Sequence, residues 1–343
     1  MSKHRKPILD VLQGKTPEQI PVWLMRQAGR YLPEYRDLRA KSKNFLNMCL
    51  TPDLATEITL QPIRRFSMDA AILFADILLV PLALGVGLEF KEGEGPVLEP
   101  LSDAKSIEKL FYDAQKVSAV FETVKRVKAD LPDQTALIGF CGAPWTVACY
   151  MIDGHSRTGF ASAKEWAKEH PERLDDLIRC LVDASETYLA AQIVAGAEVI
   201  QIFDSWAGLL SGQDFERFII KPTAELVRRL KKNYPHVPII GFPREAGENY
   251  AAYIRQTGID AMSIDPSVDL EKAKRDLQSV KPLQGNLDPA LLVKGGAEMK
   301  KALSKMLTTF GPRHIANLGH GVVPETPPQH VAEMVDFVHG FRI

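Results

Sequence analysis

Short runs of apolar and β-branched residues recur along the chain, and glycine, proline or charged residues bound them. They are PVWLM from residue 21, AAILF from 70, ALIGF from 136, EVIQIF from 198, PIIGF from 238, DAMSI from 260, KPLQG from 281 and HIANLG from 314. Continuous rather than alternating apolar character is typical of strands in a parallel sheet that is covered on both faces. The pattern therefore predicts eight parallel strands.

Most intervals between these runs carry apolar residues at helical spacing, as in residues 117–127 and 174–182. Thr51-Pro52-Asp53 has the form of a helix cap, an N1 proline and a first-turn acid, and Thr257-Gly258 predicts a helix end. Further helices are expected before Gly311 and at the carboxyl terminus, the latter with an apolar face of Val331, Met334, Val335 and Val338.

Eight strands, each followed by a helix, match a (β/α)8 TIM barrel, whereas a doubly wound sheet would usually show fewer strands and a glycine-rich first turn. Length alone leaves one barrel or two smaller domains open, but no change in composition or internal repeat marks a boundary. We therefore expect an α/β fold in which residues 1–343 form one (β/α)8 barrel domain. Residues 84–100 predict a β-hairpin inserted after the second strand.

Composition and charge narrow the classes of function. Hydrophobic residues make up 45% and charged residues 25% of the chain, as in soluble globular proteins. Lys and Arg total 42 against 43 for Asp and Glu, so the net charge offers no general attraction to nucleic acid or anionic lipid. Residues 1–15 lack the apolar core of a signal peptide, and no run reaches the roughly 18 apolar residues of a membrane span. A cytoplasmic protein that binds neither nucleic acid nor membrane is expected.

The sequence lacks the usual motifs of metal and nucleotide sites. The cysteines at positions 49, 141, 149 and 180 form no CxxC pair and no Cys/His cluster, so free thiols are expected. There is no HExxH motif and no Walker loop, and Gly85-Val86-Gly87 does not complete a dinucleotide fingerprint. We therefore expect neither a metal nor a cofactor.

Active sites of such barrels lie at the carboxyl ends of the strands, and polar or turn-forming residues follow every predicted strand here. In chain order these residues are Arg26–Arg30, Asp76, Cys141–Pro144, Asp204–Trp206, Pro243-Arg244, Asp265-Pro266, Asn286–Pro289 and Gly319–Gly321. The chemistry is therefore expected among these segments.

Residues 23–39 place Arg26, Arg30, Arg36 and Arg39 in one short stretch whose Ala-Gly and Leu-Pro pairs argue against a long helix. A guanidinium group makes two parallel, charge-assisted hydrogen bonds to a carboxylate. Several such groups would hold a ligand with several carboxylates. A solvated or salt-bridged surface loop is the alternative interpretation.

Asp76 lies in the apolar stretch AAILFADILLVPLALG, and no basic residue occurs between Arg65 and Lys91. A carboxylate in such surroundings needs a partner, which a substrate N–H group or cation would supply. The alternative is a structural aspartate that caps the next helix.

Three further side chains are candidates for hydrogen bonds to a substrate. Tyr150, in GAPWTVACYMIDG, could donate to a carboxylate, although a core tyrosine is the commoner meaning. Ser205, in FDSWAG, lacks the GxSxG elbow, which favours hydrogen bonding over a role as hydrolase nucleophile. His320 lies between two glycines that would let a substrate approach closely, with a structural histidine as the alternative.

The stretches PVWLMRQAGRYLPEYR and GFCGAPWTVACYMIDG resemble the two signature motifs of the uroporphyrinogen decarboxylase family. FADIL, FDSWAG, GNLDP and LGHGVVPETP are similar to further family segments, so the resemblance extends from Pro21 to Pro328. It implies a homodimeric, single-domain (β/α)8 barrel. It also implies a cofactor-free carboxy-lyase that converts the acetate arms of uroporphyrinogen III to methyl groups, giving coproporphyrinogen III in haem biosynthesis.

The resemblance also implies roles for individual residues. Catalysis is expected from Asp76, Arg26 and Arg30, with Asp76 facing the pyrrole nitrogens and stabilising a pyrrole cation. Substrate contacts are expected from Arg26, Gln27, Ala28, Gly29, Arg30, Arg39, Asp76, Tyr150, Ser205 and His320.

Two alternatives remain at this point. A zinc- and corrinoid-dependent methyltransferase of the same fold would need a His/Cys set for the metal, yet no cysteine follows Cys180. A non-catalytic tetrapyrrole carrier would share the arginines but would have no need of a carboxylate placed at Asp76.

Overall fold

The computed structural model describes residues 5–91, 93–101 and 104–342. Its main sheet contains seven strands that neighbour one another in chain order, and every neighbouring pair is parallel. They are β1 (Ala70–Ile72), β4 (Ala136–Gly142), β5 (Val199–Asp204), β6 (Ile239–Pro243), β7 (Ala261–Ser263), β8 (Leu283–Leu287) and β9 (His314–Leu318). Every residue of these strands is buried. The continuous apolar runs are thus explained by a sheet that is covered on both faces.

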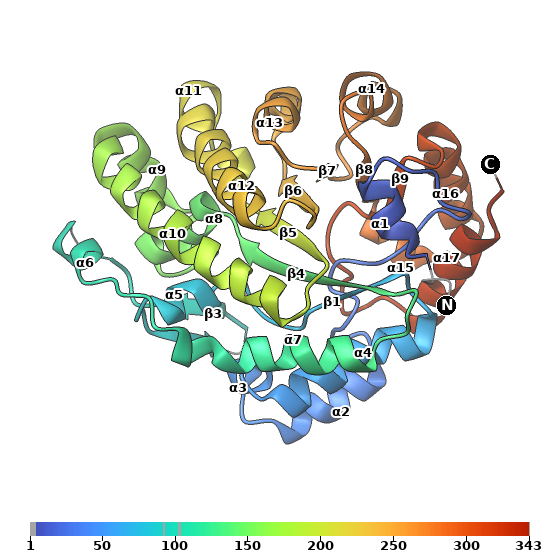
Figure 1. Cartoon of the computed structure of the whole chain (residues 1–343), viewed down its shortest axis with the longest axis horizontal. Helices are drawn as coiled ribbons and strands as arrows, with labels where there is room; N and C mark the ends of the chain where they lie inside the picture. Colours follow the sequence, from blue (N-terminus) through green and yellow to red (C-terminus); the bar gives the residue numbers. More distant parts are fainter. Residues whose placement is uncertain (1–4, 92, 102–103, 343) are drawn as a thin grey trace.

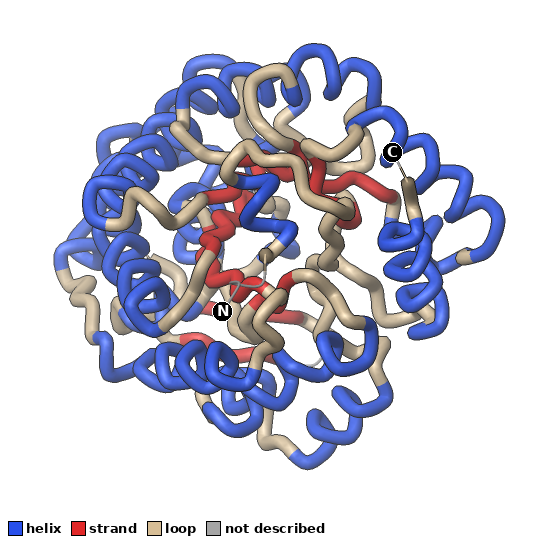
Figure 2. Tube along the Cα trace, turned by 45° about the vertical axis from the view of Figure 1, so that its right-hand side comes forward, coloured by secondary structure: helices blue, strands red, loops and turns tan. Residues whose placement is uncertain are grey.

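The sheet curls into a barrel with the helices outside it (Figures 1 and 2). The helices are α1 (Pro7–Leu12), α2 (Pro33–Lys41), α3 (Phe45–Cys49), α4 (Pro52–Phe66), α5 (Leu79–Ala83), α6 (Ala104–Glu108), α7 (Ser118–Asp130), α8 (Pro144–Asp153), α9 (Ala161–Glu169), α10 (Pro171–Ala195), α11 (Gly212–Phe215), α12 (Lys221–Asn233), α13 (Tyr250–Gln256), α14 (Leu270–Ala273), α15 (Pro289–Lys294), α16 (Gly296–Phe310) and α17 (Pro328–Gly340). The expected α/β TIM-barrel fold is confirmed. No helix of the described ranges is both long and apolar enough to span a membrane.

The first predicted strand, residues 21–25, is realised as a single bridge. Val22 pairs in parallel with Ala316 of β9, and Asp69, just before β1, donates its backbone N–H to the Val22 carbonyl at 2.9 Å. The segment therefore lies between β9 and β1 and completes the barrel. The pairing does not extend beyond this bridge, because the N–H groups of Leu24 and Met25 donate to the side chains of Gln27 and Asn317, at 3.1 Å each, instead of to a neighbouring strand.

Helix boundaries follow the sequence signals closely. α4 begins at Pro52 with Thr51 at the N-cap and Asp53 in the first turn, although the Thr51 side chain makes no capping hydrogen bond. α13 ends at Gln256, directly before Thr257, and α16 ends before Gly311, which has a φ of 62°. α17 buries the four apolar residues predicted for the last helix.

The predicted hairpin is present and packs near the end of α8. β2 (Leu88–Lys91) pairs antiparallel with β3 (Gly95–Leu98) in the connection after β1. The Leu98 N–H donates to the Gly154 carbonyl at 2.8 Å. Gly154 ends α8 with a φ of 77°, and a Cβ atom there would lie 2.9 Å from the Leu98 carbonyl oxygen. A glycine thus allows both the helix end and the close approach of the hairpin.

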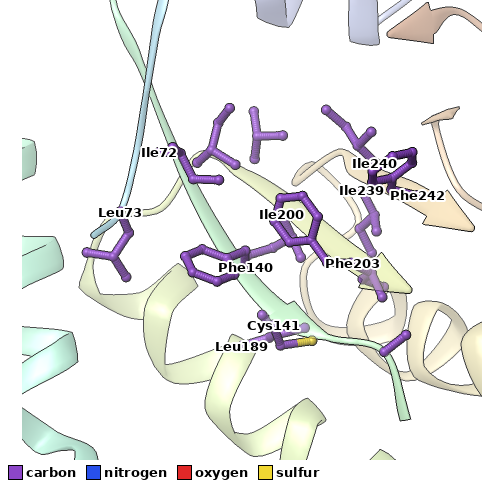
Figure 3. Packing of buried hydrophobic residues seen from close by; sticks show 14 of the residues in the cluster. Ile72, Leu73, Phe140, Cys141, Leu189, Ile200, Phe203, Ile239, Ile240 and Phe242 are labelled. Atoms are coloured by element: carbon purple, nitrogen blue, oxygen red, sulfur yellow. The ribbon is translucent and has the colours of Figure 1, made fainter. Parts of the chain in front are cut away.

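Inward-pointing side chains fill the barrel in layers. Phe203 packs edge-on against Phe140 and Phe242, at ring-centroid distances of 5.5 and 6.4 Å (Figure 3). On the same side of β5, Gln201 donates to Ser263 at 3.2 Å, and Gln284 bonds both of these side chains. Side chains alternate along a strand, so Ile202 and Asp204 of β5 face the helices instead.

Candidate active site

The loop after the Val22 bridge carries the arginine cluster, and residues 23–32 contain no helix. Arg26 has a left-handed backbone with a φ of 63°, a conformation that few non-glycine residues adopt. The Val322 N–H donates to the Met25 carbonyl at 2.8 Å, which joins this loop to the one after β9. A Cβ atom on Gly321 would lie 2.7 Å from Arg26 Cγ and 2.9 Å from its Nε, so the glycine leaves room for the Arg26 side chain where the two loops meet.

Side chains of the loop and of α2 hold its shape. Gln27 is fully buried; its amide donates to the Ala70 carbonyl and accepts from the Leu24 N–H, both at 3.1 Å. Arg36 donates to the carbonyls of Arg30 and Tyr31 at 2.9 and 3.1 Å. The buried Gln27 and the exposed Arg36 therefore fix the loop conformation through hydrogen bonds, while Ala28 and Gly29 lie at its partly exposed tip.

Arg26, Arg30 and Arg39 are exposed, and none of the three forms an ion pair with a described acidic residue. Although the Arg26 side chain reaches solvent, the surrounding protein partly desolvates its guanidinium group, which lowers the pKa of Arg26. The nearby charge of Asp76 opposes this shift. Arg39 and Arg30 both act on Tyr35, where they oppose the rise in pKa that burial causes. The salt-bridged form of the alternative therefore does not describe these three side chains, whereas their exposure is compatible with the solvated form.

Asp76 follows β1 and is held by one oxygen. Its Oδ1 accepts the Leu78 N–H at 2.8 Å, in the turn that leads into α5. Burial raises the pKa of Asp76 to about 6, and the Leu78 hydrogen bond and the Arg26 charge oppose this rise. The structural interpretation thus accounts for one carboxylate oxygen. No described residue donates a hydrogen bond to the other oxygen.

Tyr150 and Ser205 come from neighbouring elements. Tyr150 is on α8, and the charge of Asp76 contributes to the rise in the Tyr150 pKa, which burial dominates. The Tyr150 ring packs against Phe160 and Trp206, with centroids 5.1 and 6.4 Å away. Ser205, directly before Trp206, is partly exposed at the carboxyl end of β5.

His320 is a neutral group at this end of the barrel. Burial lowers its pKa to about 4, assisted by the positive charges of Arg26 and Arg244. Its Nδ1 accepts the Gly321 N–H at 2.7 Å, so in the neutral ring Nε2 carries the proton. His320 therefore presents an uncharged N–H donor near the arginines.

Arg244 is a residue to which sequence reasoning assigned no role beyond its place after a strand. Its charge acts on both Arg26 and His320, so it belongs to the same end of the barrel. It pairs with Glu245, whose φ is 60° and whose N–H donates to Asp265 at 2.8 Å. Its position directly after β6 was the sequence signal that could have identified Arg244 as a site residue. Arg26, Asp76, Tyr150, His320 and Arg244 thus form one electrostatically connected group.

Comparisons with known proteins identify relatives over nearly the whole chain. Residues 3–341 match the sequence profile of the uroporphyrinogen decarboxylase (URO-D) family. A uroporphyrinogen decarboxylase of Rhodospirillum rubrum is 50% identical over 344 residues, covering 99% of each chain. One of Granulibacter bethesdensis is 50% identical over 97% of this chain and 98% of its own.

Solved structures support the fold alone. A methyltransferase from Methanosarcina mazei superposes with a TM-score of 0.79 at 18% identity, covering 98% of both chains. A B12-independent methionine synthase from Shewanella sp. W3-18-1 gives 0.57 at 11% identity, covering 84% of this chain and 87% of that one. Within the described ranges, no three His, Cys, Asp or Glu side chains gather in a way that could hold a metal ion. Because residues 3–341 match the family profile and relatives of that name are 50% identical over nearly the whole chain, the chain belongs to the uroporphyrinogen decarboxylase family.

Proposed function

We propose that the protein is a uroporphyrinogen decarboxylase, a carboxy-lyase that converts the four acetate arms of uroporphyrinogen III to methyl groups and yields coproporphyrinogen III. The observation that carries this proposal is a carboxylate, Asp76, with one oxygen free of described donors, near Arg26, which pairs with no described acidic residue. The near-full-length identity to relatives of that name supports it independently.

The arginines hold the substrate. Arg26, Arg30 and Arg39 form no ion pair with a described acidic residue, so they can bind carboxylates, which the arms of the substrate supply. The backbone of residues 26–30 shapes this contact, and Gln27 fixes it from beneath. Holding several arms at once orients the ring system before reaction, which lowers the entropic part of the barrier.

Asp76 stabilises the cation that the reaction forms. Protonation of a pyrrole ring carbon makes the ring an electron sink conjugated to the acetate arm. The bond to CO2 then breaks, its electron pair enters the ring, and protonation of the exocyclic carbon followed by loss of the ring proton leaves a methyl group. A fixed carboxylate at the ring N–H groups acts most strongly where positive charge develops. With a pKa of about 6, Asp76 is mostly ionised at neutral pH.

Tyr150, Ser205 and His320 are proposed as uncharged hydrogen-bond donors to the substrate. Burial raises the pKa of Tyr150 and lowers that of His320, so both are neutral at neutral pH. Neutral donors contact the arms without competing with the arginines for charge. Cytoplasmic location, a homodimer and a single domain are predictions from the sequence and the family resemblance.

The direct test is anaerobic incubation of the purified protein with uroporphyrinogen III, without added metal or cofactor. CO2 release and the stepwise appearance of partly decarboxylated porphyrinogens are expected. A tetrapyrrole carrier would bind the substrate and release no CO2. A zinc-dependent methyltransferase would contain stoichiometric zinc by metal analysis and leave the arms intact.

A further inference from the structure

Asp204 is a second buried carboxylate near the proposed substrate site, and it has no part in the chemistry above. It is the last residue of β5, directly before Ser205, and its side chain is fully buried. Because Gln201 and Phe203 point into the barrel, Asp204 points to the opposite side, toward the helices. It therefore does not face the substrate.

On the helix side, Asp204 accepts a hydrogen bond from the hydroxyl of Thr146, in the first turn of α8, at 2.6 Å. The Thr146 oxygen in turn accepts the backbone N–H of Trp206 at 3.0 Å. A hydroxyl has one proton to donate, and a backbone N–H can only donate. The Trp206 N–H can only donate to Thr146, and an ionised Asp204 can only accept from it, so the Thr146 hydroxyl bridges the two groups.

The backbone carbonyl of Trp206 is also held by a side chain of α8. The Trp145 indole N–H donates to the Trp206 carbonyl at 3.0 Å. Two adjacent side chains of α8 thus bind both backbone polar groups of Trp206. Ser205 lies between Asp204 and Trp206, the two residues that these contacts hold.

Thr146 and Tyr150 are four residues apart on α8, so their side chains lie on the same face of the helix. The Trp206 ring packs against both Tyr150 and Phe160, and the centroid distance to Phe160 is 4.9 Å. The bond to Thr146 consequently sets the position of the Ser205–Trp206 segment relative to Tyr150. Tyr150 and Ser205, two of the proposed neutral donors, form one wall of the site, and their relative position depends on this bond.

The Asp204 carboxyl group is costly to bury at this place. Burial raises the pKa of Asp204 to about 7, and no described residue bonds its Oδ2. An asparagine would accept the same Thr146 hydrogen bond, so the position of the loop depends on this bond rather than on the negative charge. Costly buried polar groups of this kind concentrate at sites where position matters for function.

We propose that Asp204 is a positioning residue which, through Thr146, fixes the Ser205–Trp206 segment against Tyr150 and so orients the wall that contacts the substrate arms. This inference rests on the proposed decarboxylase function. It assigns Asp204 no contact with the substrate and no proton transfer.

The test compares Thr146→Val, Thr146→Ser and Asp204→Asn with Thr123→Val. Thr123 is a matched control because it is equally buried, its hydroxyl bonds the Ala119 carbonyl at 2.9 Å, and it lies on α7 outside the site. Thr146→Val removes both hydrogen bonds and is expected to lower kcat/KM about tenfold. Thr146→Ser keeps the hydroxyl and is expected to regain most of the loss. Asp204→Asn keeps an acceptor and is expected to lose less than Thr146→Val.

Hydrogen exchange of the Trp206 amide gives a second readout that needs no substrate. Faster exchange is expected in Thr146→Val and unchanged exchange in Thr123→Val. A Thr146→Val enzyme with unaltered kcat/KM, or with the Trp206 amide as protected as before, would overturn the inference. Loss of all turnover in Asp204→Asn would also overturn it, because the carboxyl would then act directly. Absence of turnover in the wild type would refute the proposed function, whereas the exchange data would still decide whether Thr146 holds Trp206.

Discussion

Replacing Gly321 by alanine is expected to displace the Arg26 side chain while leaving the barrel folded. The new methyl group would lie 2.7 Å from Arg26 Cγ and 2.9 Å from Nε, with Cδ nearer still. These atoms belong to the middle of the side chain, and the Arg26 backbone is held by a left-handed turn and by the Val322 bond to Met25. The guanidinium group therefore has to move. Gly321 itself has no left-handed backbone, so alanine adds the contact without backbone strain.

The size of the effect follows from the contact that is lost. A hydrogen bond to a charged group contributes about 1.5–3 kcal/mol, and each 1.4 kcal/mol corresponds to about tenfold in affinity. Because Arg26 is exposed, the lower end of this range applies. KM for uroporphyrinogen III is therefore expected to rise about tenfold.

The assay is steady-state decarboxylation under anaerobic conditions, with thermal unfolding of the same samples. Gly340→Ala is the matched control, because a Cβ atom there meets nothing within 4 Å and the residue ends α17. Its KM is expected to equal that of the wild type. A Gly321→Ala enzyme with unchanged KM would refute the assignment of Arg26 as a substrate contact.

Three further predictions follow from the same contacts. First, kcat/KM is expected to fall about tenfold per pH unit below pH 6, because the Asp76 carboxylate has a pKa of about 6 and must be ionised; a flat profile from pH 7 to 5 would contradict this. Second, Arg30→Ala is expected to raise KM, with the exposed Arg275→Ala as control; equal KM values would count against Arg30 as a substrate contact. Third, His339→Gln is expected to lower Tm more at pH 5.5 than at pH 9. Hydrogen bonding to Asp69 raises the His339 pKa, so this stabilisation is complete below the unfolded-state value and is lost as pH rises through the folded one; a Tm difference independent of pH would refute it.

The periodicity of the sequence predicted the barrel because fully buried parallel strands read as continuous apolar runs. It did not predict that residues 21–25 pair with the sheet only through the bridge at Val22. That outcome depends on the side chains of Gln27 and Asn317, which capture the N–H groups of Leu24 and Met25. Side-chain capture of this kind leaves no mark on an apolar pattern.

The candidate site was predictable in position but not in detail. Knowing that strand ends converge was enough to gather Arg26, Asp76, Ser205 and His320. The sequence alone could not show that the Gln27 side chain turns into the fold. The bond between Thr146 and Asp204 joins residues 58 positions apart, so it depends on how α8 packs against β5.

The central claim is that Asp76 acts on the cation formed during the reaction and contributes little to holding the substrate. Asp76→Asn keeps the acceptor for the Leu78 N–H and removes the charge, so the local fold is expected to persist. Binding of uroporphyrinogen III, measured anaerobically, should change little, while single-turnover CO2 release should slow by about a hundredfold or more. CO2 release at the wild-type rate, or a loss confined to binding, would contradict the account.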